Sequence, residues 1–351
     1  MLQRYNFFSY ECDVMKKIVF LHLRIFNNSK MQKVFKDNYI QKEIQHAATR
    51  YRTIFIFFTL FFVLYASSYG QGNSEIKRDT AKGFDFFVNP SMYFGHKKNA
   101  NYYRGVPSVM ESGSADPNIR YILDNKYLHL QIMNLIKDHH RGIADTTFRL
   151  EELSNMRYTA NFCFGIGARY RFTENLSIGV VFTQARMTAH GIANLGIKIM
   201  EVNSADVLPY PLVGKERRNF FELTAHYIFS TQGIVSPFLE AGMHVGNTRV
   251  ISSELIVEER SFSLIDRSGV GTNYDPSLSY PERNLKLGGI GYGFSAAVGL
   301  RISFNKWAAI EPVAQFRLEK IQLAGYNSIT PNYNFMIRLV LGDKVFAKTV
   351  N

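Results

Sequence analysis

Cysteine is nearly absent from this chain: 351 residues contain only Cys12 and Cys163. Cys12 lies upstream of a candidate export signal, so Cys163 is expected to be left without a partner. A disulfide framework is therefore excluded, and no cysteine-based metal motif is present. Cys163 lies in an alternating segment, where we expect a small residue facing a barrel interior.

Long apolar runs are also scarce. The clearest, residues 53–65, has about 13 residues, fewer than the ~20 that a membrane-spanning helix needs. Arg50 and Arg52 precede this run and small residues follow it, which predicts a signal peptide cleaved after Gly70 or Gln71. An uncleaved anchor is the alternative.

The positive charge is local and carries little functional meaning. The formal net charge is +12, and residues 1–71 contain ten Lys or Arg and four Asp or Glu, which accounts for +6 of it. The rest of the chain is only mildly basic and has no basic helix or basic patch interleaved with aromatic residues. We therefore expect no nucleic-acid partner.

The sequence is instead rich in alternation between apolar and small or charged residues. In residues 158–172 and 290–304 every second residue is apolar, and glycine, serine or arginine lies between. Side chains alternate across a strand, so each segment has one wholly apolar face. The second face is too small to be a solvated surface, which indicates a narrow barrel with its apolar face toward lipid. A soluble lipocalin-like barrel, apolar inside, is the alternative.

Eight such segments predict an all-β fold, an eight-stranded antiparallel transmembrane β-barrel. Each is about 10 residues or longer, enough to cross a bilayer when tilted. The predicted strands are residues 83–94, 157–172, 176–186, 219–229, 237–246, 289–304, 307–318 and 332–341.

The connections alternate strictly between short and long, as in outer-membrane barrels with short periplasmic turns and long external loops. The short ones are residues 173–175, 230–236 and 305–306, and the long ones are 95–156, 187–218, 247–288 and 319–331. We divide the chain into an N-terminal extension with signal peptide (1–71), a periplasmic lead-in (72–82), the transmembrane barrel (83–341) and a C-terminal tail (342–351).

The longest loop is expected to carry a helix over residues 117–140. Asp116 offers an N-cap, Pro117 suits the first helical position, and Gly142 could end the helix. Apolar residues recur between them at loosely helical spacing.

Two segments resemble a known group of proteins. Residues 162–182, FCFGIGARYRFTENLSIGVVF, look like the central hairpin of Bacteroidota outer-membrane β-barrel proteins, the OmpA-like or PorT-like barrel family, and residues 310–319 resemble their penultimate strand. The resemblance covers about residues 83–341. It implies an outer-membrane location, and the PorT-like branch implies an accessory role in protein secretion.

Strand parity places many charged residues inside the barrel, where they are expected to form ion pairs because little water is available to solvate them. The predicted lumen charge network consists of Arg169, Arg171, Glu222, Glu240, Arg301, Glu311, Arg317 and Arg338. Parity adds Arg157, His226 and His244 to this inward face. A narrow ion path is the alternative interpretation. A zinc or acid–base site built from Glu222, His226, Glu240 and His244 is a weaker one.

No feature of the sequence predicts an enzyme. There is no Gly-x-Ser-x-Gly motif, and Gly289, Gly291 and Gly293 alternate within a strand instead of preceding a helix as in a phosphate-binding loop. We expect no catalytic residue, metal or cofactor. The predicted function is a non-enzymatic anchor that contacts outer-membrane lipid and an unknown protein partner through external loops or periplasmic turns. The alternative is a small pore or transporter.

Overall fold

The computed structural model describes residues 82–106, 116–140, 148–198, 205–229, 234–304 and 308–342. The predicted signal peptide lies outside these ranges, and so do all but the edge residues of the predicted lead-in and tail.

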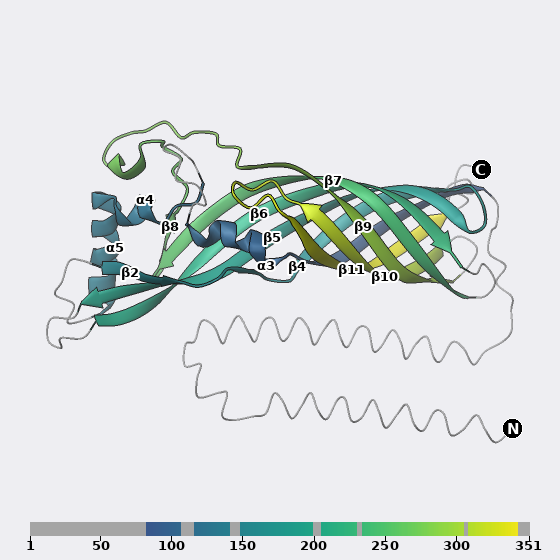
Figure 1. Cartoon of the computed structure of the whole chain (residues 1–351), viewed down its shortest axis with the longest axis horizontal. Helices are drawn as coiled ribbons and strands as arrows, with labels where there is room; N and C mark the ends of the chain where they lie inside the picture. Colours follow the sequence, from purple (N-terminus) through teal and green to yellow (C-terminus); the bar gives the residue numbers. More distant parts are fainter. Residues whose placement is uncertain are drawn as a thin grey trace, which may run out of the picture. The chain divides into compact units, whose positions relative to one another are not determined.

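Eight long strands form a closed antiparallel ring (Figure 1). They are β1 (Gly83–Phe94), β4 (Asn161–Arg171), β5 (Leu176–Lys198), β6 (Ala205–Ile228), β7 (Val235–Val257), β9 (Gly288–Ser303), β10 (Ala308–Lys320) and β11 (Ile329–Gly342). Each strand pairs with its neighbour in this series, and β1 also pairs with β11, which closes the ring. The predicted eight-stranded antiparallel barrel is confirmed.

The outer surface of the ring is apolar and its inner surface is polar. Phe164 on β4 is 50% exposed and Phe294 on β9 is 62% exposed, whereas Arg169 and Arg301 are 2% and 6% exposed. Apolar side chains that point outward from a closed barrel need lipid around them. This polarity excludes the lipocalin-like alternative. No helix in the described ranges is long and apolar enough to span a membrane.

Glycines on the inner face make room for larger neighbours in the narrow bore. A Cβ added to Gly167 would lie 2.5 Å from the ring of Phe87, which reaches across from β1. A Cβ added to Gly293 would lie 2.7 Å from the imidazole of His244 on β7. These glycines therefore let bulky groups fill the interior of a small barrel.

The predicted long loop 187–218 is mostly strand and the predicted loop 247–288 is strand in its first part, which corrects both predictions. Strands β5, β6 and β7 continue well past the ends predicted for them, and paired residues run unbroken to Lys198 and Ala205. The predicted strand 157–172 is also divided: β3 (Arg157–Tyr158) is a separate short strand that pairs with β5. Arg157, expected to face inward, is exposed.

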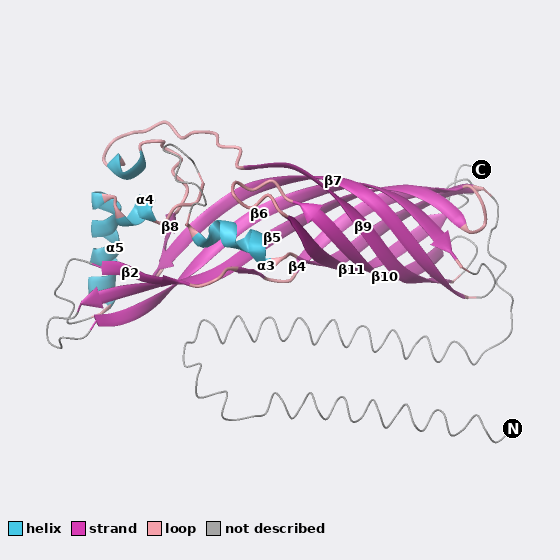
Figure 2. Cartoon of the chain, viewed as in Figure 1, coloured by secondary structure: helices cyan, strands magenta, loops and turns pink. Residues whose placement is uncertain are grey.

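The extended strands carry helices and short strands at the end opposite the short turns (Figure 2). These elements are α3 (Lys97–Ala100), η1 (Asn101–Arg104), α4 (Arg120–Leu123), α5 (Lys126–His139), β2 (Phe148–Leu153), β8 (Arg260–Ser263) and η2 (Gly271–Asn273). We call this assembly the external dome. It includes the distal parts of β5, β6 and β7, which are the parts that continue past the predicted strand ends.

The single helix predicted over residues 117–140 is wrong in detail, because the chain forms two helices there. Asn125 breaks the run: its side-chain oxygen accepts a hydrogen bond from the Leu128 amide at 2.8 Å and caps α5. Its amide group donates to the carbonyls of Thr272 and Tyr274 at 2.8 and 2.7 Å. A buried asparagine that caps one helix and holds another loop is better satisfied here than in mid-helix.

The dome has an apolar core of its own. Ile132, Met133 and Ile136 on α5 are buried against residues from the distal strands, such as Leu195 and Leu255. The inner face of the extended strands is therefore polar within the barrel and apolar within the dome. The outer face is apolar around the barrel and mixed around the dome, where Ile192, Val207 and Ile251 are exposed beside polar residues.

Candidate functional site

All eight residues of the predicted charge network have side chains that lie inside the barrel, on six different strands. Seven are buried and Arg171 is partly buried. The structure also brings acids into contact with them that the prediction did not include.

The first group of ion pairs lies toward the end of the barrel with the short turns. Arg169 contacts Asp85 through Nε at 3.2 Å and Glu311 through Nη1 at 3.2 Å. Arg301 Nη1 lies 3.0 Å from Asp85 and 3.3 Å from Glu311. Arg171 lies 3.5 Å from the second oxygen of Asp85. Two carboxylates thus bind three guanidinium groups in a buried cluster.

Arg338 on β11 extends this cluster to β7. Its guanidinium makes two bonds to Glu240, at 2.8 and 3.0 Å, and lies 3.4 Å from Glu311. The ring of Phe87 lies against it, with the Arg338 guanidinium carbon 4.6 Å from the ring centroid. Paired hydrogen bonds and an aromatic face replace the water that these charges lose on burial.

A second group is centred on Glu222. Its carboxylate accepts hydrogen bonds from Arg317 at 2.7 Å and Gln315 at 2.9 Å, and a further one from Ser295. The Arg317 guanidinium also lies 4.8 Å from the ring centroid of Phe220. Glu222 therefore has three hydrogen-bond partners, which come from β9 and β10.

A third group joins the barrel interior to the dome. Arg218 pairs with Glu216 and donates to the hydroxyl of Tyr93 at 3.1 Å, and that hydroxyl donates to Glu319 at 2.7 Å. Tyr103 donates a hydrogen bond to Glu216 from the dome side. Burial and the nearby Glu216 carboxylate raise the pKa of Tyr103 well above its ordinary value.

Sequence reasoning missed four charged residues of these groups. Asp85 could have been found by parity, because it lies between the outward-facing Phe84 and Phe86. Glu319 was assigned to the start of a loop. Glu216 and Arg218 lie in the segment predicted as an external loop, where the regular apolar alternation of the outer face is lost.

The ion pairs of the barrel interior balance one another. Among the described residues, six arginines pair with six acids: Arg169, Arg171, Arg218, Arg301, Arg317 and Arg338 with Asp85, Glu216, Glu222, Glu240, Glu311 and Glu319. These large, mutually bonded side chains lie within the barrel and carry no net charge as a set.

The weaker zinc or acid–base interpretation does not match the contacts. Glu222 is opposite His244 and His226 is opposite Glu240 in the β6–β7 register. Both carboxylates, however, bind arginine, and His226 contacts the hydroxyl of Ser177 at 3.3 Å. Within the described ranges no group of three His, Cys, Asp or Glu residues could hold a metal ion.

A closed ring of eight strands, an apolar outer belt and a paired polar interior define a transmembrane β-barrel of the outer-membrane type. Closed barrels of this kind span outer membranes, so the fold gives the outer membrane as its location.

No family model and no curated protein matches the chain. Among solved structures, it is similar to Neisserial surface protein A, with 10% identity, 74% of this chain and 96% of that chain covered, and a TM-score of 0.34. It is similar to the attachment invasion locus protein of Yersinia pestis, with 8% identity, 74% and 98% coverage and a TM-score of 0.31. OprG from Pseudomonas aeruginosa shows 9% identity, 76% and 97% coverage and a TM-score of 0.31.

Proposed function

We propose that this protein is a non-enzymatic outer-membrane anchor that presents its external dome to a protein partner. The observation that carries the proposal is the apolar core of the dome, which packs α5 against the distal strands. A flexible loop needs no such core, whereas a binding surface gains from being rigid before it meets its partner.

The exposed side of α5 supports this role. Tyr127 and Leu130 are three residues apart, so they lie on one helix face, and both are large apolar residues exposed to solvent. The secretion-accessory form of the proposal rests on the resemblance of residues 162–182 and 310–319 to PorT-like barrels.

Cross-linking and affinity capture of the full-length protein from intact cells tests the proposal. We expect a specific envelope protein to copurify and to be lost when Tyr127 and Leu130 are both changed to Glu. A secretion complex among the captured proteins would support the PorT-like form. Unchanged capture by this variant would contradict the role of the dome face.

The alternative, a small pore or transporter, is tested separately in planar bilayers. The neutral, paired interior predicts little conductance for the pure protein. Steady, sizeable channels would favour the pore and would contradict the anchor.

A further inference from the structure

Three arginines form a row on the outer surface of the extended strands. Arg186 on β5 is directly opposite Arg217 on β6, and Arg217 is directly opposite Arg249 on β7. All three alternate with buried residues and lie on the outer face of the strands, as the lipid-facing Phe182 does. We call these three residues the arginine row.

The position of this row relative to the lipid belt is defined by the strands. Phe182 and Phe221 are opposite each other and exposed, and the next outward residues, Gln184 and Asn219, join their side-chain amides at 3.0 Å. The row comes one step further along each strand. Arg186 is four residues beyond Phe182, about 13 Å along a strand, or about 10 Å along the axis of a tilted barrel. A distance of about 10 Å from the lipid-facing Phe182 brings the arginine row to the level of the lipid headgroups.

Within the part of the chain that the structure describes, no acid forms an ion pair with the arginine row. Like charges directly opposite each other across strands are destabilising. Each arginine of the barrel interior has a carboxylate partner, but no ion pair to a described residue is formed by Arg186, Arg217 or Arg249. The Nε of Arg217 is buried and has no hydrogen-bond partner among the described residues.

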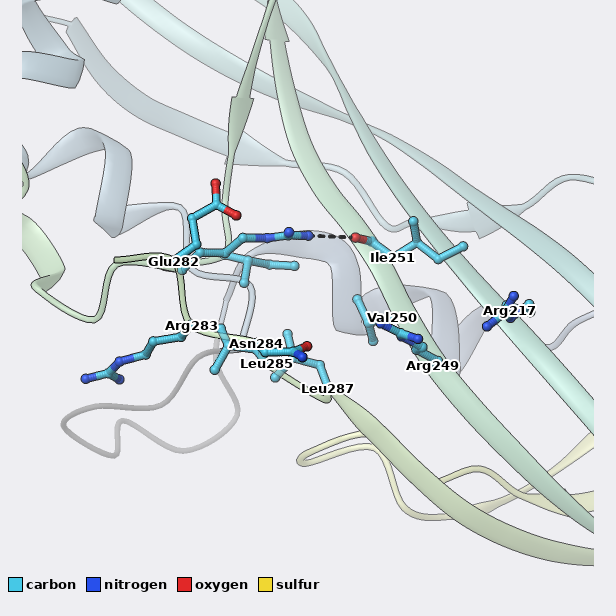
Figure 3. A pocket seen from close by; sticks show the side chains of 11 residues that line it. Arg217, Arg249, Val250, Ile251, Glu282, Arg283, Asn284, Leu285 and Leu287 are labelled. Atoms are coloured by element: carbon cyan, nitrogen blue, oxygen red, sulfur yellow. Dashed lines mark hydrogen bonds between the residues drawn. The ribbon is translucent and has the colours of Figure 1, made fainter. Parts of the chain in front are cut away.

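Two of the three arginines of the row also line a pocket. Arg217 and Arg249 line a pocket of about 520 Å³ between β7 and the connection from β8 to β9 (Figure 3). Arg267 adds a guanidinium group, whereas the side chain of Arg283 extends away from the other lining residues (Figure 3). Glu282 is the one acid among the described lining residues. Apolar residues complete it: Val250, Ile251, Ile265, Leu285 and Leu287.

The exposed Arg267 side chain is joined to β7 by a hydrogen bond. It donates one hydrogen bond to the carbonyl of Ile251 at 3.1 Å, drawn as the dashed line in Figure 3. A guanidinium carries five N–H donors in a planar fork that suits phosphate oxygens. The pocket volume is in the range of small-ligand sites.

We infer that the arginine row and its pocket bind the phosphate monoester of a glycolipid headgroup in the outer leaflet. The phosphate supplies the negative charge that the row lacks, and the apolar lining suits the faces of the sugar that carries it. The lipid is favoured over a soluble ligand because the row lies directly beyond the lipid-facing belt on the same strand faces.

The test uses the full-length protein in detergent, with purified lipid A as the probe. We expect the Arg217→Gln, Arg249→Gln double variant to bind phosphorylated lipid A about tenfold or more weakly than the unchanged protein. Lipid A stripped of phosphate should bind the unchanged protein as weakly as phosphorylated lipid A binds the variant. The control is Arg120→Gln with Arg149→Gln, which removes the same charge from exposed dome positions and should leave binding unchanged.

Heat-dependent gel mobility confirms that each variant is folded before binding is measured. Equal affinity of the double variant and the unchanged protein would overturn the inference, as would an equal loss in the control. Binding indifferent to the phosphate would also overturn it. Full displacement of the lipid by free glucosamine phosphate would show that the site takes a soluble ligand, which contradicts the lipid assignment.

Discussion

Arg169 and Glu311 form an ion pair across the barrel, between strands β4 and β10, which are not neighbours in the ring. The two residues are 142 positions apart in the chain. Glu311 also contacts Arg301 and Arg338, so it links strands on several sides of the bore. This pair joins opposite walls of the barrel and stabilises its closed form.

Changing Arg169 to Leu should destabilise the barrel markedly. It removes one partner of a buried pair and leaves the carboxylates of Asp85 and Glu311 under-compensated, at a cost on the order of 3–5 kcal/mol. We expect the temperature at which the protein loses its folded gel mobility to fall clearly. Phe164→Leu is the matched control on the same strand, because Leu is equally soluble in lipid. A larger effect of the Phe164 change would mean that the two faces are reversed.

The outer boundary of the lipid belt should lie between Phe182 and Thr188 on β5. In a background where the single tryptophan, Trp307, is changed to Phe, we expect Phe182→Trp to be quenched strongly by brominated lipid chains. Thr188→Trp should be quenched weakly, because Thr188 lies on the outer face about 20 Å further along the strand. Equal quenching at both positions would place the whole hairpin in lipid and contradict an external dome.

The core of the dome should be separable from the barrel in its response to mutation. Ile132 is fully buried on α5, so Ile132→Ala should cost about 2–5 kcal/mol locally. We expect faster proteolysis and hydrogen exchange in α5, with the heat-dependent gel mobility of the barrel retained. Leu130→Ala is the control on the same helix, since Leu130 is 52% exposed. A similar effect of both changes would argue against a packed dome core.

Alkaline pH should loosen the junction between barrel and dome. The pKa of Tyr103 is raised above its ordinary value of 10.0 by burial and by Glu216. The folded state therefore favours the neutral phenol. Its stabilising contribution is complete below pH 10.0 and is lost progressively as the pH rises above that value.

Ultraviolet absorbance of phenolate and protease sensitivity of the dome measure this effect together. We expect phenolate from the buried tyrosines to form late and to coincide with dome cleavage. Tyr103→Phe should weaken the dome at neutral pH and reduce the additional loss at alkaline pH. Dome stability that does not change between neutral and strongly alkaline pH would contradict the role of the Tyr103–Glu216 contact.

The sequence by itself determined the architecture of the barrel and the chemistry of its two faces. A period of two is a local property, so Phe162 to Phe172 reveals its lipid-facing side without knowledge of any partner strand. Short turns such as residues 173–175 then order the strands as neighbouring hairpins. The same parity indicated that Arg169 and Arg301 face inward, although it did not say which acids they meet.

Only the tertiary structure decided those partners, the dome and the arginine row. Arg169 meets Glu311, and Arg217 stands between Arg186 and Arg249, because closing the ring sets one register for all eight strands at once. Beyond Phe182 the outer face becomes mixed and the inner face becomes apolar, so the sequence pattern there resembles a loop. Strand pairing and the packing of α5 over distant residues make it an ordered structure, and neither is visible in a local stretch of sequence.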